Sequence, residues 1–593
     1  MSEYVEKDQV RKMKDSVITK RLLAYARPFL GKFILVLFLM LFTVIVDVVG
    51  PLITGEVINM LGSDNIVYEH VLFLILAYVA FILISNGVAY VQAITLQKVG
   101  QSIIYDIRKD VFVHIENLAI AQINKTPIGK LVTRVTNDTN TLSEMFTNSL
   151  VNLVRNFATI IFVVIAMFIS NVKITLIILS VTPFVVLFTI FFQKISRKAY
   201  RAYRTNLSNM NAFLSENLSG MKITQMFNQE EKQYKDFKDR NTRLEKSNLK
   251  SIITFGVFRP TMYLLYVLAV ILVVYFGSLE TLSNPFFLAG LVYTFYQFVS
   301  KLFNPIQQLA DQFNTIQSAF ASSERIFEIL DTESEIVDSE DALEINEFKG
   351  KIEFKNVWFA YEENEWILKD VSFVVEPKET VAFVGATGAG KTTILSLIVR
   401  NYDIQKGQIL IDGIDIKKIK LSSLRKNIGQ MLQDVFLFSG TIKSNIQMRD
   451  ESITDEEIYN ACEYVNANHF IEKLDNKYDE EVRERGNNFS SGQRQLLSFA
   501  RTIVHKPQIM ILDEATANID TETEVLIQES LEKMRNIGTM LIVAHRLSTI
   551  QHADKIVVLR HGEIQEIGNH QELLKKKGQY YDLYRIQYEN KKN

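Results

Sequence analysis

Six apolar runs in the first half of the chain constrain its fold more than any other feature of the sequence. Each run approaches the roughly 20 residues that a helix needs to cross the hydrocarbon core of a bilayer. The first run is too long for a removable signal peptide and lacks a small-residue cleavage site, so we expect it to be kept as a span. The sequence therefore predicts a membrane domain with six transmembrane helices, at about residues 33–53, 71–93, 148–170, 174–195, 254–276 and 285–304.

Basic residues between the runs indicate the side of the membrane on which each loop lies. The segments after the second and fourth runs are long and rich in lysine and arginine, whereas residues 62–70 and 277–285 contain neither. Loops rich in these residues stay in the cytoplasm. We therefore expect a multi-pass protein of the cytoplasmic (inner) membrane, with both termini and the two long loops in the cytoplasm.

Local patterns divide the chain further. The two long loops have helical spacing and few turn residues, so the membrane helices are expected to continue well below the membrane. Basic and apolar residues at 17–30 predict an interfacial helix, with an ordinary soluble helix as the alternative. The acidic segment that follows the last span is typical of a linker. The predicted domains are an N-terminal cytoplasmic or interfacial helix, a transmembrane domain, an acidic linker and a nucleotide-binding domain, at residues 1–32, 33–330, 331–350 and 351–593.

Composition argues against several functions. The 593-residue chain has a formal net charge of −2, so it lacks the basic excess of a nucleic-acid-binding protein. Its single cysteine, Cys462, cannot form an intramolecular disulfide and gives no support to a zinc site. One cysteine in so long a chain is typical of a reducing compartment.

A glycine-rich turn lies between the short apolar strand 381–384 and a helix in the α/β part of the chain. Backbone N–H groups in such a turn face the phosphates of a nucleotide, and the helix N-terminus adds partial positive charge. Lys391 would reach the β and γ phosphates, and Thr392 would bind Mg²⁺. The predicted nucleotide-binding residues of this loop are Gly385, Ala386, Thr387, Gly388, Ala389, Gly390, Lys391, Thr392 and Thr393.

Two adjacent carboxylates follow the apolar run that ends at Leu512. Asp513 ends a predicted buried strand, so its carboxylate lies at the sheet edge where a metal-bound nucleotide would sit. Glu514 points elsewhere and can take a proton from an attacking water molecule. The alternative is a solvated start of a loop. Together with the phosphate loop, the pair predicts ATP hydrolysis with Mg²⁺ as cofactor.

The region from Lys351 onward resembles an ABC-transporter ATPase domain, and with the six spans the whole chain resembles an exporter-type half-transporter. The most diagnostic motif is similar to the family signature and opens an amphipathic helix; it comprises Phe489, Ser490, Ser491, Gly492 and Gln493. Without the resemblance, these residues would only predict a helix cap with an anion-binding N-terminus.

The resemblance implies further roles, position by position. Tyr361 corresponds to the aromatic residue that stacks on adenine, and Gln433 to the glutamine that senses Mg²⁺ and couples to the membrane domain. Asp520 corresponds to the aspartate that communicates across a dimer, and His545 to the histidine that holds the γ-phosphate. The implied catalytic residues are Glu514, His545 and Gln433, and the implied Mg²⁺ ligands are Thr392, Gln433 and Asp513, the last through water.

Two departures from the family pattern bear on the partner. In this family the signature of one ATPase domain completes the site on the other, so a chain with one such domain must pair. The third position of the signature is usually glycine, and here it is Ser491. The residue before Glu484-Arg485-Gly486 is also usually glycine, and here it is Arg483. A side chain where backbone meets phosphate should weaken the site that this signature serves. We therefore expect a heterodimer with a degenerate second subunit, and a homodimer is the alternative.

Substrate identity is less constrained. Asp47 inside the first span is costly unless it faces a cavity or a partner, and it could bind cationic cargo or make structural hydrogen bonds. A direct pair with Arg155 is not expected, because Arg155 is placed nearer the inner surface. Aromatic walls suit bulky or cationic cargo, and the predicted substrate residues are Asp47, Tyr293, Tyr296 and Gln297.

The sequence thus predicts ATP-driven export of hydrophobic or cationic compounds, as in multidrug efflux. A lipid or peptide exporter on the same fold is the main alternative, and an importer with this membrane fold or an ATP-gated channel also carries these motifs. Six spans exclude a soluble or DNA-organising ATPase.

Overall fold

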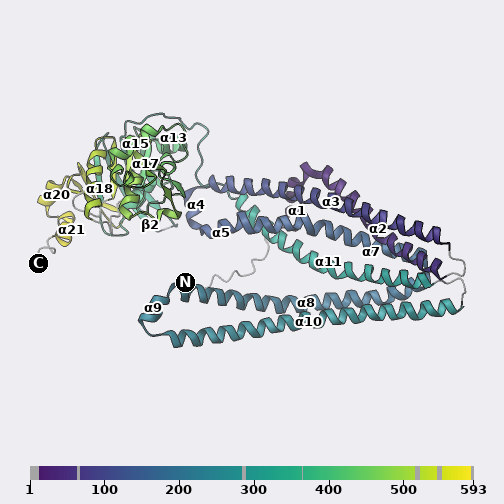
Figure 1. Ribbon diagram of the computed structural model, residues 1–593. Coiled ribbons are helices and arrows are strands. Elements are labelled where there is room, and N and C mark those ends of the chain that lie inside the picture. Colours follow the sequence, from purple (N-terminus) through teal and green to yellow (C-terminus); the bar gives the residue numbers. More distant parts are fainter. Residues whose placement is uncertain are drawn as a thin grey trace. The chain divides into compact units, whose positions relative to one another are not determined.

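A computed structural model describes residues 13–62, 67–283, 289–363, 365–513, 521–543 and 550–588. The chain divides into two compact units (Figure 1). The first comprises Met1–Glu116 and Pro127–Thr332, and the second comprises Asn117–Thr126 and Glu333–Asn593. A short piece of the first long loop therefore belongs with the C-terminal unit.

The first unit is helical. Its elements are α1 (Asp15–Ala26), α2 (Leu30–Leu61), α3 (Tyr68–Glu116), α5 (Ile128–Thr133), α6 (Thr139–Glu144), α7 (Leu150–Ser170), α8 (Val172–Ser219), α9 (Met221–Met226), α10 (Glu230–Ser283) and α11 (Ala289–Leu330). Two π-helical turns, η2 (Arg134–Asp138) and η3 (Met145–Ser149), continue α5 into α6 and α6 into α7. Helix α3 has 49 residues, or about 74 Å at 1.5 Å per residue, which is far more than a span needs. The prediction that membrane helices continue beyond the bilayer is thus confirmed.

Five helical stretches among the described residues are long and apolar enough to cross a membrane, namely Asp15–Leu61, Tyr68–Glu116, Ile128–Ser170, Val172–Ser219 and Glu230–Leu279. They contain the first five predicted spans. The sixth predicted span falls on α11, which is a continuous helix of 42 residues but is not among the five. Polar residues such as Gln297, Lys301 and Asn304 interrupt its apolar sequence. The sixth crossing therefore stays a prediction.

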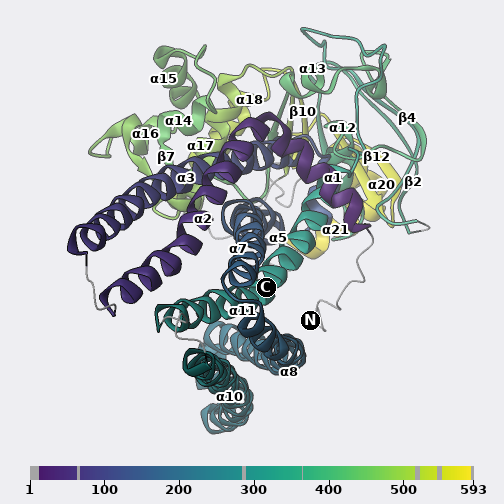
Figure 2. The same ribbon diagram turned by 90° about the vertical axis from the view of Figure 1, so that its right-hand side faces the viewer.

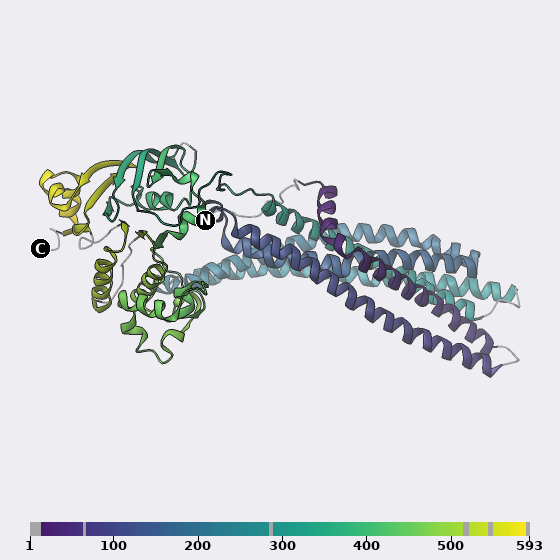
Figure 3. The same ribbon diagram turned by 90° about the horizontal axis from the view of Figure 1, so that it is seen from above.

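Helix α11 packs against several helices of the first unit. Viewed along the helices, α7 and α11 lie between the α2–α3 pair and the α8–α10 pair (Figure 2). Helices α8 and α10 run side by side over most of their length (Figure 3), with the rings of Phe192 and Phe258 stacked at 4.1 Å between centroids. Helix α1 buries Ile18 and Leu22 in a cluster with residues of α3 and α11, while Leu23 is exposed, so its interfacial placement stays a prediction.

Two glycines bring the outer ends of α2 and α11 into backbone contact. A Cβ atom on Gly55 would lie 2.7 Å from the carbonyl oxygen of Gly290, and a Cβ on Gly290 would overlap the carbonyl oxygen of Gly55. The Gly290 N–H donates to Asn59 Oδ1 at 2.7 Å, and Thr294 Oγ1 donates to the carbonyl oxygen of Pro51 at 3.0 Å. These contacts fix the register between the two helices.

The second unit is α/β, as predicted. Its strands are β1 (Ile352–Ala360), β2 (Trp366–Val375), β3 (Thr380–Val384), β4 (Lys406–Ile411), β5 (Ile414–Asp415), β6 (Ile428–Met431), β7 (Gly440–Thr441), β8 (Glu481–Val482), β9 (Ile509–Asp513), β10 (Thr539–Val543), β11 (Lys555–Arg560) and β12 (Glu563–Gly568). The central sheet has the order β12-β11-β3-β10-β9-β6, and β11, β3, β10, β9 and β6 pair in parallel. Parallel strands buried on both faces read as continuous apolar runs, as β3 and β10 do.

Helices cover this sheet and form a second core with it. They are α12 (Lys391–Ile398), α13 (Leu421–Lys426), α14 (Ile442–Gln447), α15 (Asp455–Tyr464), α16 (Asn468–Ile471), α17 (Ser491–Val504), α18 (Thr521–Met534), α20 (His570–Lys576) and α21 (Gln579–Tyr588). The short helix α4 (Ile120–Lys125) also belongs to this unit. A large apolar cluster joins α14, α15 and α17 to one face of the sheet, and a second cluster joins β1, β2 and β4 to the other.

The acidic segment predicted as a linker is held against the second unit. Asp338 Oδ1 accepts a hydrogen bond from the Leu421 N–H at 2.8 Å, and Leu343 forms a parallel bridge with Ile419. The Lys420 ammonium lies 2.8 Å from a Glu344 carboxylate oxygen and lowers the pKa of that carboxyl group. Most of this segment is therefore ordered along the α/β unit.

Candidate nucleotide-binding site

The glycine-rich turn connects β3 to α12 in the predicted strand–turn–helix arrangement. All five residues of β3 are buried, and α12 begins at Lys391. Gly388 and Gly390 have φ of +82° and +101°, which side chains rarely adopt. A Cβ atom on Gly390 would also lie 2.6 Å from Leu368 Cδ2. Glycine is thus required where the loop turns its backbone toward the helix N-terminus.

Lys391 is held inside this turn. Its side chain is only 6% exposed, and its Nζ donates to the carbonyl oxygens of Gly385 and Ala386 at 2.8 and 3.1 Å. Burial lowers the pKa of the Lys391 ammonium, and the negative charge of Asp513 opposes this shift. The lysine and the aspartate therefore influence each other across the sheet edge, as a site for nucleotide phosphates and a cation requires.

The carboxyl ends of three parallel strands bring the predicted groups to one edge of the sheet. Asp513 ends β9 opposite Val543 of β10, and Val543 lies opposite Phe383 of β3, just before the turn. Ligands bind outside the carboxyl ends of strands in open parallel sheets. Three predicted residues, Glu514, Asp520 and His545, lie outside the described residues.

The oxygen donors at this edge suit Mg²⁺. Thr392 is exposed at the start of α12, Asp513 is half-buried, and Gln433 is exposed two residues after β6. Since β6 pairs in parallel with β9, Gln433 leaves the sheet on the same edge as Asp513. Mg²⁺ is usually held by one or two carboxylates together with phosphates and water. The described residues contain no cluster of three His, Cys, Asp or Glu side chains that could hold a metal ion, and the Mg²⁺ site stays a prediction.

Tyr361 follows β1 and lies beside α12. Its hydroxyl hydrogen-bonds Thr393 Oγ1 at 3.1 Å, and its ring packs edge-on against Phe359 and Tyr402, with centroids 4.9 and 5.0 Å away. The side chain is 44% exposed, so part of the ring remains available for stacking. An aromatic side chain therefore lies beside the phosphate loop, where an adenine ring would need it.

Helix α4 approaches the same aromatic cluster, which the sequence did not reveal. Asn124 Nδ2 donates to the Tyr402 hydroxyl at 3.3 Å, and Lys125 Nζ lies 3.4 Å from Glu335 Oε1. A cavity of about 390 Å³ lies between α4 and the cluster, and Tyr361 lines it. A lone tyrosine in a loop and a six-residue helix carry no sequence signal that would have identified this contact.

Helix α17 begins at the signature-like motif. Ser490 Oγ accepts a hydrogen bond from the Gln493 N–H at 3.2 Å, and Gln493 Oε1 accepts one from the Ser490 N–H at 2.9 Å. This capping box explains why the helix begins here. The predicted amphipathic helix is confirmed, because Leu496, Phe499 and Ala500 are buried. Ser490 is exposed, Ser491 is half-buried and Gly492 is buried.

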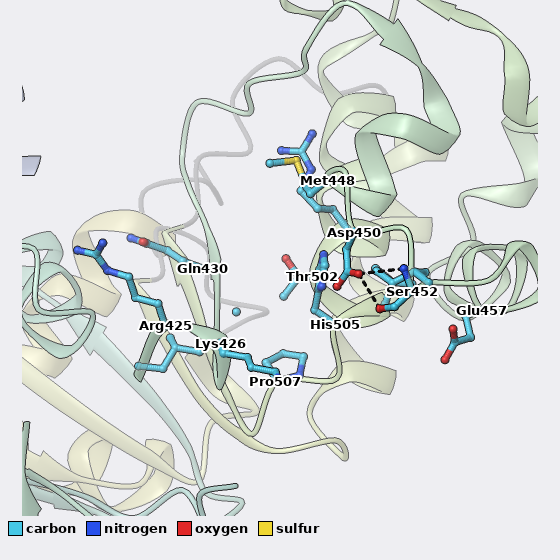
Figure 4. Close-up of a pocket in the computed structure, with 15 residues that line it drawn as sticks. Arg425, Lys426, Gln430, Met448, Asp450, Ser452, Glu457, Thr502, His505 and Pro507 are labelled. Carbon is cyan, nitrogen blue, oxygen red and sulfur yellow. Dashed lines mark hydrogen bonds between the residues drawn. The ribbon is translucent and has the colours of Figure 1, made fainter. Parts of the chain in front are cut away.

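A polar pocket lies at the other end of α17. About 580 Å³ in volume, it is bounded by β6, by the end of α17 and by the loop after α14 (Figure 4). Asp450 accepts hydrogen bonds from the Ser452 N–H and hydroxyl, and burial lowers the pKa of His505. The pocket contains none of the predicted site residues, although Gln430 lines it three positions before Gln433.

Comparison with known proteins decides the family. Residues 33–306 match the model of the ABC transporter transmembrane region, and residues 368–517 match that of the ABC transporter. A putative ABC transporter ATP-binding protein of Streptococcus pneumoniae, exp8, is 39% identical over 97% of this chain and 98% of its own length. The chain belongs to the ABC transporter family. It combines the membrane and ATPase parts of an exporter-type half-transporter, which hydrolyses ATP to drive transport.

Other relatives of this ABC transporter differ in their described cargo. The probable multidrug resistance ABC transporter ATP-binding/permease protein YheH of Bacillus subtilis is 38% identical over 87% of this chain and 76% of its own length. The ATP-dependent lipid A-core flippase of Syntrophus aciditrophicus is 33% identical over 97% and 95%. Exporter function is thus shared, while the cargo varies among relatives.

The membrane part of the transporter corrects one expectation. Arg155 Nη2 donates to Asp47 Oδ2 at 3.1 Å, so the two residues form the ion pair that the sequence argument did not expect. The two residues meet because α2 continues to Leu61, beyond the predicted first span, so that Asp47 lies nearly as far from the end of its helix as Arg155 does from Ser170 at the end of α7. The other predicted substrate residues lie on α11, where Gln297 Nε2 donates to the Tyr293 hydroxyl at 2.9 Å, and Tyr293 and Tyr296 are 36% and 41% exposed.

Proposed function

We propose that this ABC transporter is one subunit of a multidrug-type exporter in the cytoplasmic membrane, with its ATPase domain in the cytoplasm. The proposal is carried by one observation: Lys391, Thr392 and Asp513 gather at one edge of a parallel sheet. Multidrug export is described for relatives such as YheH, and the exposed tyrosines of α11 suit amphiphilic cargo. Because Asp47 is paired with Arg155, its charge no longer argues for cationic cargo.

In the proposed mechanism, ATP binds at the phosphate loop, where Thr392, Gln433 and, through water, Asp513 would hold Mg²⁺. When bound, this cation would offset part of the phosphate charge. Lys391 exchanges its contacts with loop carbonyl oxygens for the phosphates, Tyr361 stacks on the adenine, and Glu514 accepts a proton from the attacking water. The start of α17 faces the nucleotide of the partner subunit with Ser490, Ser491, Gly492 and Gln493. The two sites of the dimer are completed by Asp520 and His545. ATP binding closes the dimer, and hydrolysis reopens it.

We propose a non-identical partner. Ser491 and Arg483 depart from the family pattern in the signature region, while Lys391 and Asp513 are intact. This combination suits a pair with one working and one degenerate site. A lipid exporter remains the second candidate, because the lipid A-core flippase aligns with nearly the whole chain.

Reconstitution tests the proposal. The chain, purified with the second half-transporter with which it assembles, should hydrolyse ATP and move an amphiphilic dye across proteoliposomes in an ATP-dependent way. Glu514→Gln should abolish at least about 90% of both activities, because a single working glutamate then drives the pair. Turnover at the unchanged rate in Glu514→Gln would contradict the mechanism. Full activity of the chain purified alone would contradict the non-identical partner.

A further inference from the structure

An ion pair stands inside the membrane part of the transporter. Asp47 on α2 and Arg155 on α7 are joined by one hydrogen bond of 3.1 Å, and their side chains are 48% and 44% exposed. Charged groups at membrane depth almost always face a water-filled cavity or a protein partner, because contact with lipid is costly. Half-exposed charges in this position therefore mark a surface that cargo or the second subunit covers.

The two residues lie at the same depth. Asp47 is fourteen residues before Leu61, where α2 ends, and Arg155 is fifteen residues before Ser170, where α7 ends. At 1.5 Å per residue, they are about 21 and 23 Å from the outer ends of their helices. Asp47 lies within the predicted first span, 33–53, and Arg155 within the predicted third span, 148–170, so both charges fall inside the membrane-spanning part of their helices.

The pair uses little of its hydrogen-bonding capacity. Of the polar atoms of the two side chains, Arg155 Nη2 and Asp47 Oδ2 form the hydrogen bond. Asp47 Oδ1 and the remaining Arg155 N–H groups have no hydrogen-bond partner among the described residues. A structural arginine–carboxylate pair is frequently bidentate. This single-bond geometry leaves one acceptor of Asp47 and several donors of Arg155 available to a group that covers the pair.

Further polar groups lie at this depth. The hydrogen bond between Thr294 and Pro51 sets the register of α11 on α2. One helical turn further toward the cytoplasm lies Gln297 on α11 and Asp47 on α2, so these two residues are at the same level. Next to Arg155, Asn156 is only 5% exposed, and its Nδ2 has no hydrogen-bond partner among the described residues. Polar groups of α2, α7 and α11 thus form one layer, which we call the polar layer.

We propose that the polar layer binds the headgroup of a zwitterionic amphiphile of zero net charge. The cationic group of the headgroup binds Asp47 Oδ1, and its anionic group binds the free N–H groups of Arg155. A purely cationic amphiphile would gain from Asp47 and lose nearly as much to Arg155, since the charges lie about equally close to it. The inference rests on the proposed export function and names the cargo class of that site.

Three probes with the same chain and different headgroups test the proposal. They are dodecylphosphocholine (zwitterionic), dodecyltrimethylammonium (cationic) and dodecyl phosphate (anionic), and the readout is the concentration that half-maximally stimulates ATP hydrolysis by the complete transporter in nanodiscs. In the unmodified protein, dodecylphosphocholine should act at a concentration about tenfold lower than either other probe, a preference of about 1.4 kcal/mol.

Single substitutions should redirect this preference. Arg155→Gln leaves Asp47 unopposed, so the cationic probe should become the most potent of the three. Asp47→Asn leaves Arg155 unopposed and should favour the anionic probe. The exchange Asp47→Arg with Arg155→Asp should retain the zwitterionic preference, which controls for folding. Breaking the Arg21–Asp331 pair with Asp331→Asn removes a different ion pair of the same unit and should leave the order of probes unchanged.

The outcomes separate the possible failures. If both single variants fold and keep the order of probe potency of the unmodified protein, the inference is wrong. It is also wrong if the substitutions change the melting temperature but not the order of probe potency, because the pair then only stabilises helix packing. If the unmodified protein, reconstituted into proteoliposomes, hydrolyses ATP but transports none of the probes, the proposed export function fails instead. Transport of a fluorescent phosphatidylcholine, assayed beside dodecylphosphocholine, distinguishes a lipid headgroup from a free amphiphile as the source of the zwitterion.

Discussion

At the scale of single residues, Tyr361 connects an aromatic cluster to the start of α12 in the proposed nucleotide site. Its ring lies in an aromatic cluster with Phe359 and Tyr402, and its hydroxyl hydrogen-bonds Thr393, next to the proposed Mg²⁺ ligand Thr392. Ring and hydroxyl therefore have separable roles. The ring offers a stacking surface, and the hydroxyl positions the start of α12.

Two substitutions of Tyr361 should separate these roles. Tyr361→Ala should raise the KM for ATP about tenfold or more, because stacking of a base on an aromatic ring contributes about 1–3 kcal/mol. Tyr361→Phe keeps the ring and should raise the KM less than about threefold, as expected for one net hydrogen bond. Steady-state hydrolysis measures both, and Tyr464→Phe, which removes a hydroxyl bound to the Lys533 carbonyl, is the control. Equal effects of the two Tyr361 variants would contradict the stacking role.

Cys462 should react only when the ATPase domain opens. It is fully buried, and burial raises the pKa of its thiol to about 12. Since the thiolate is the reactive form, labelling of the native protein by N-ethylmaleimide at pH 8 should be at least about 100-fold slower than labelling of the denatured chain. The folded state favours the neutral thiol, so the stability of the domain should fall as the pH rises above the ordinary thiol value toward 12. Mass spectrometry of the labelled protein measures the rates, and similar rates in both states would contradict the burial.

Local motifs and tertiary contacts differ in how well the sequence predicted them. The environment of Lys391 was predictable, because a strand, a turn and a helix contiguous in sequence create it, and the position of Asp513 followed from its place at the end of an apolar strand. The Asp47–Arg155 pair was not, since it depends on how far two helices extend beyond the membrane and how they align. Glu514 and His545 stay predictions.

At the scale of elements, the contact between α2 and α11 depends on Gly55 and Gly290. Gly290→Ala should lower the melting temperature of the detergent-solubilised protein, because overpacking typically costs about 1–3 kcal/mol and its Cβ would overlap the Gly55 carbonyl oxygen. Gly87→Ala in α3 is a matched control, since its Cβ has no neighbouring atom within 4 Å. An equal melting temperature for Gly290→Ala and the unmodified protein would show that the helices do not approach so closely.

Helix α4 should transmit cargo binding to the ATPase domain through Gln122. The side chain of Gln122 accepts hydrogen bonds from the Ala119 and Glu335 N–H groups and donates to the Glu333 carbonyl oxygen. Gln122→Ala should reduce the stimulation of ATP hydrolysis by cargo to less than about half, since each lost hydrogen bond weakens the attachment by roughly 1 kcal/mol. Basal hydrolysis should stay within about twofold.

Lys125→Gln is the control for this helix. It removes only the exposed pair with Glu335, in which both side chains are more than half exposed, and such pairs contribute little. If Gln122→Ala retains full stimulation, α4 does not transmit cargo binding through this residue.

The positions and types of helices and strands were predictable where the pattern of apolar residues alone determines them. Long apolar runs predicted the first five spans, and alternation of apolar strands with helices predicted the α/β domain. The attachment of the acidic segment was not predictable, because it depends on single hydrogen bonds such as that between Asp338 and Leu421. The same holds for α4, whose six residues carry no pattern that assigns them to the C-terminal unit.

At the scale of the whole transporter, Ser491 distinguishes the two possible assemblies. In the proposed heterodimer this signature serves the degenerate site, so Ser491→Gly should leave ATP turnover within about twofold of the unmodified complex. In a homodimer the same change would improve both sites at once and should raise turnover severalfold, because the glycine removes a side chain where backbone approaches phosphate. Hydrolysis by purified complexes measures this. A severalfold increase would contradict the non-identical partner.

The glycine contact between α2 and α11 also restricts where cargo can leave. The backbones of the first and last long helices of the membrane part approach closely near their outer ends at Gly55 and Gly290, and the Gly290 N–H donates a hydrogen bond to Asn59. Parting them would break this bond and expose both backbones. Helices α2 and α11 should therefore move together as one unit. The opening through which cargo leaves to the outside should then form between other helices of the membrane part.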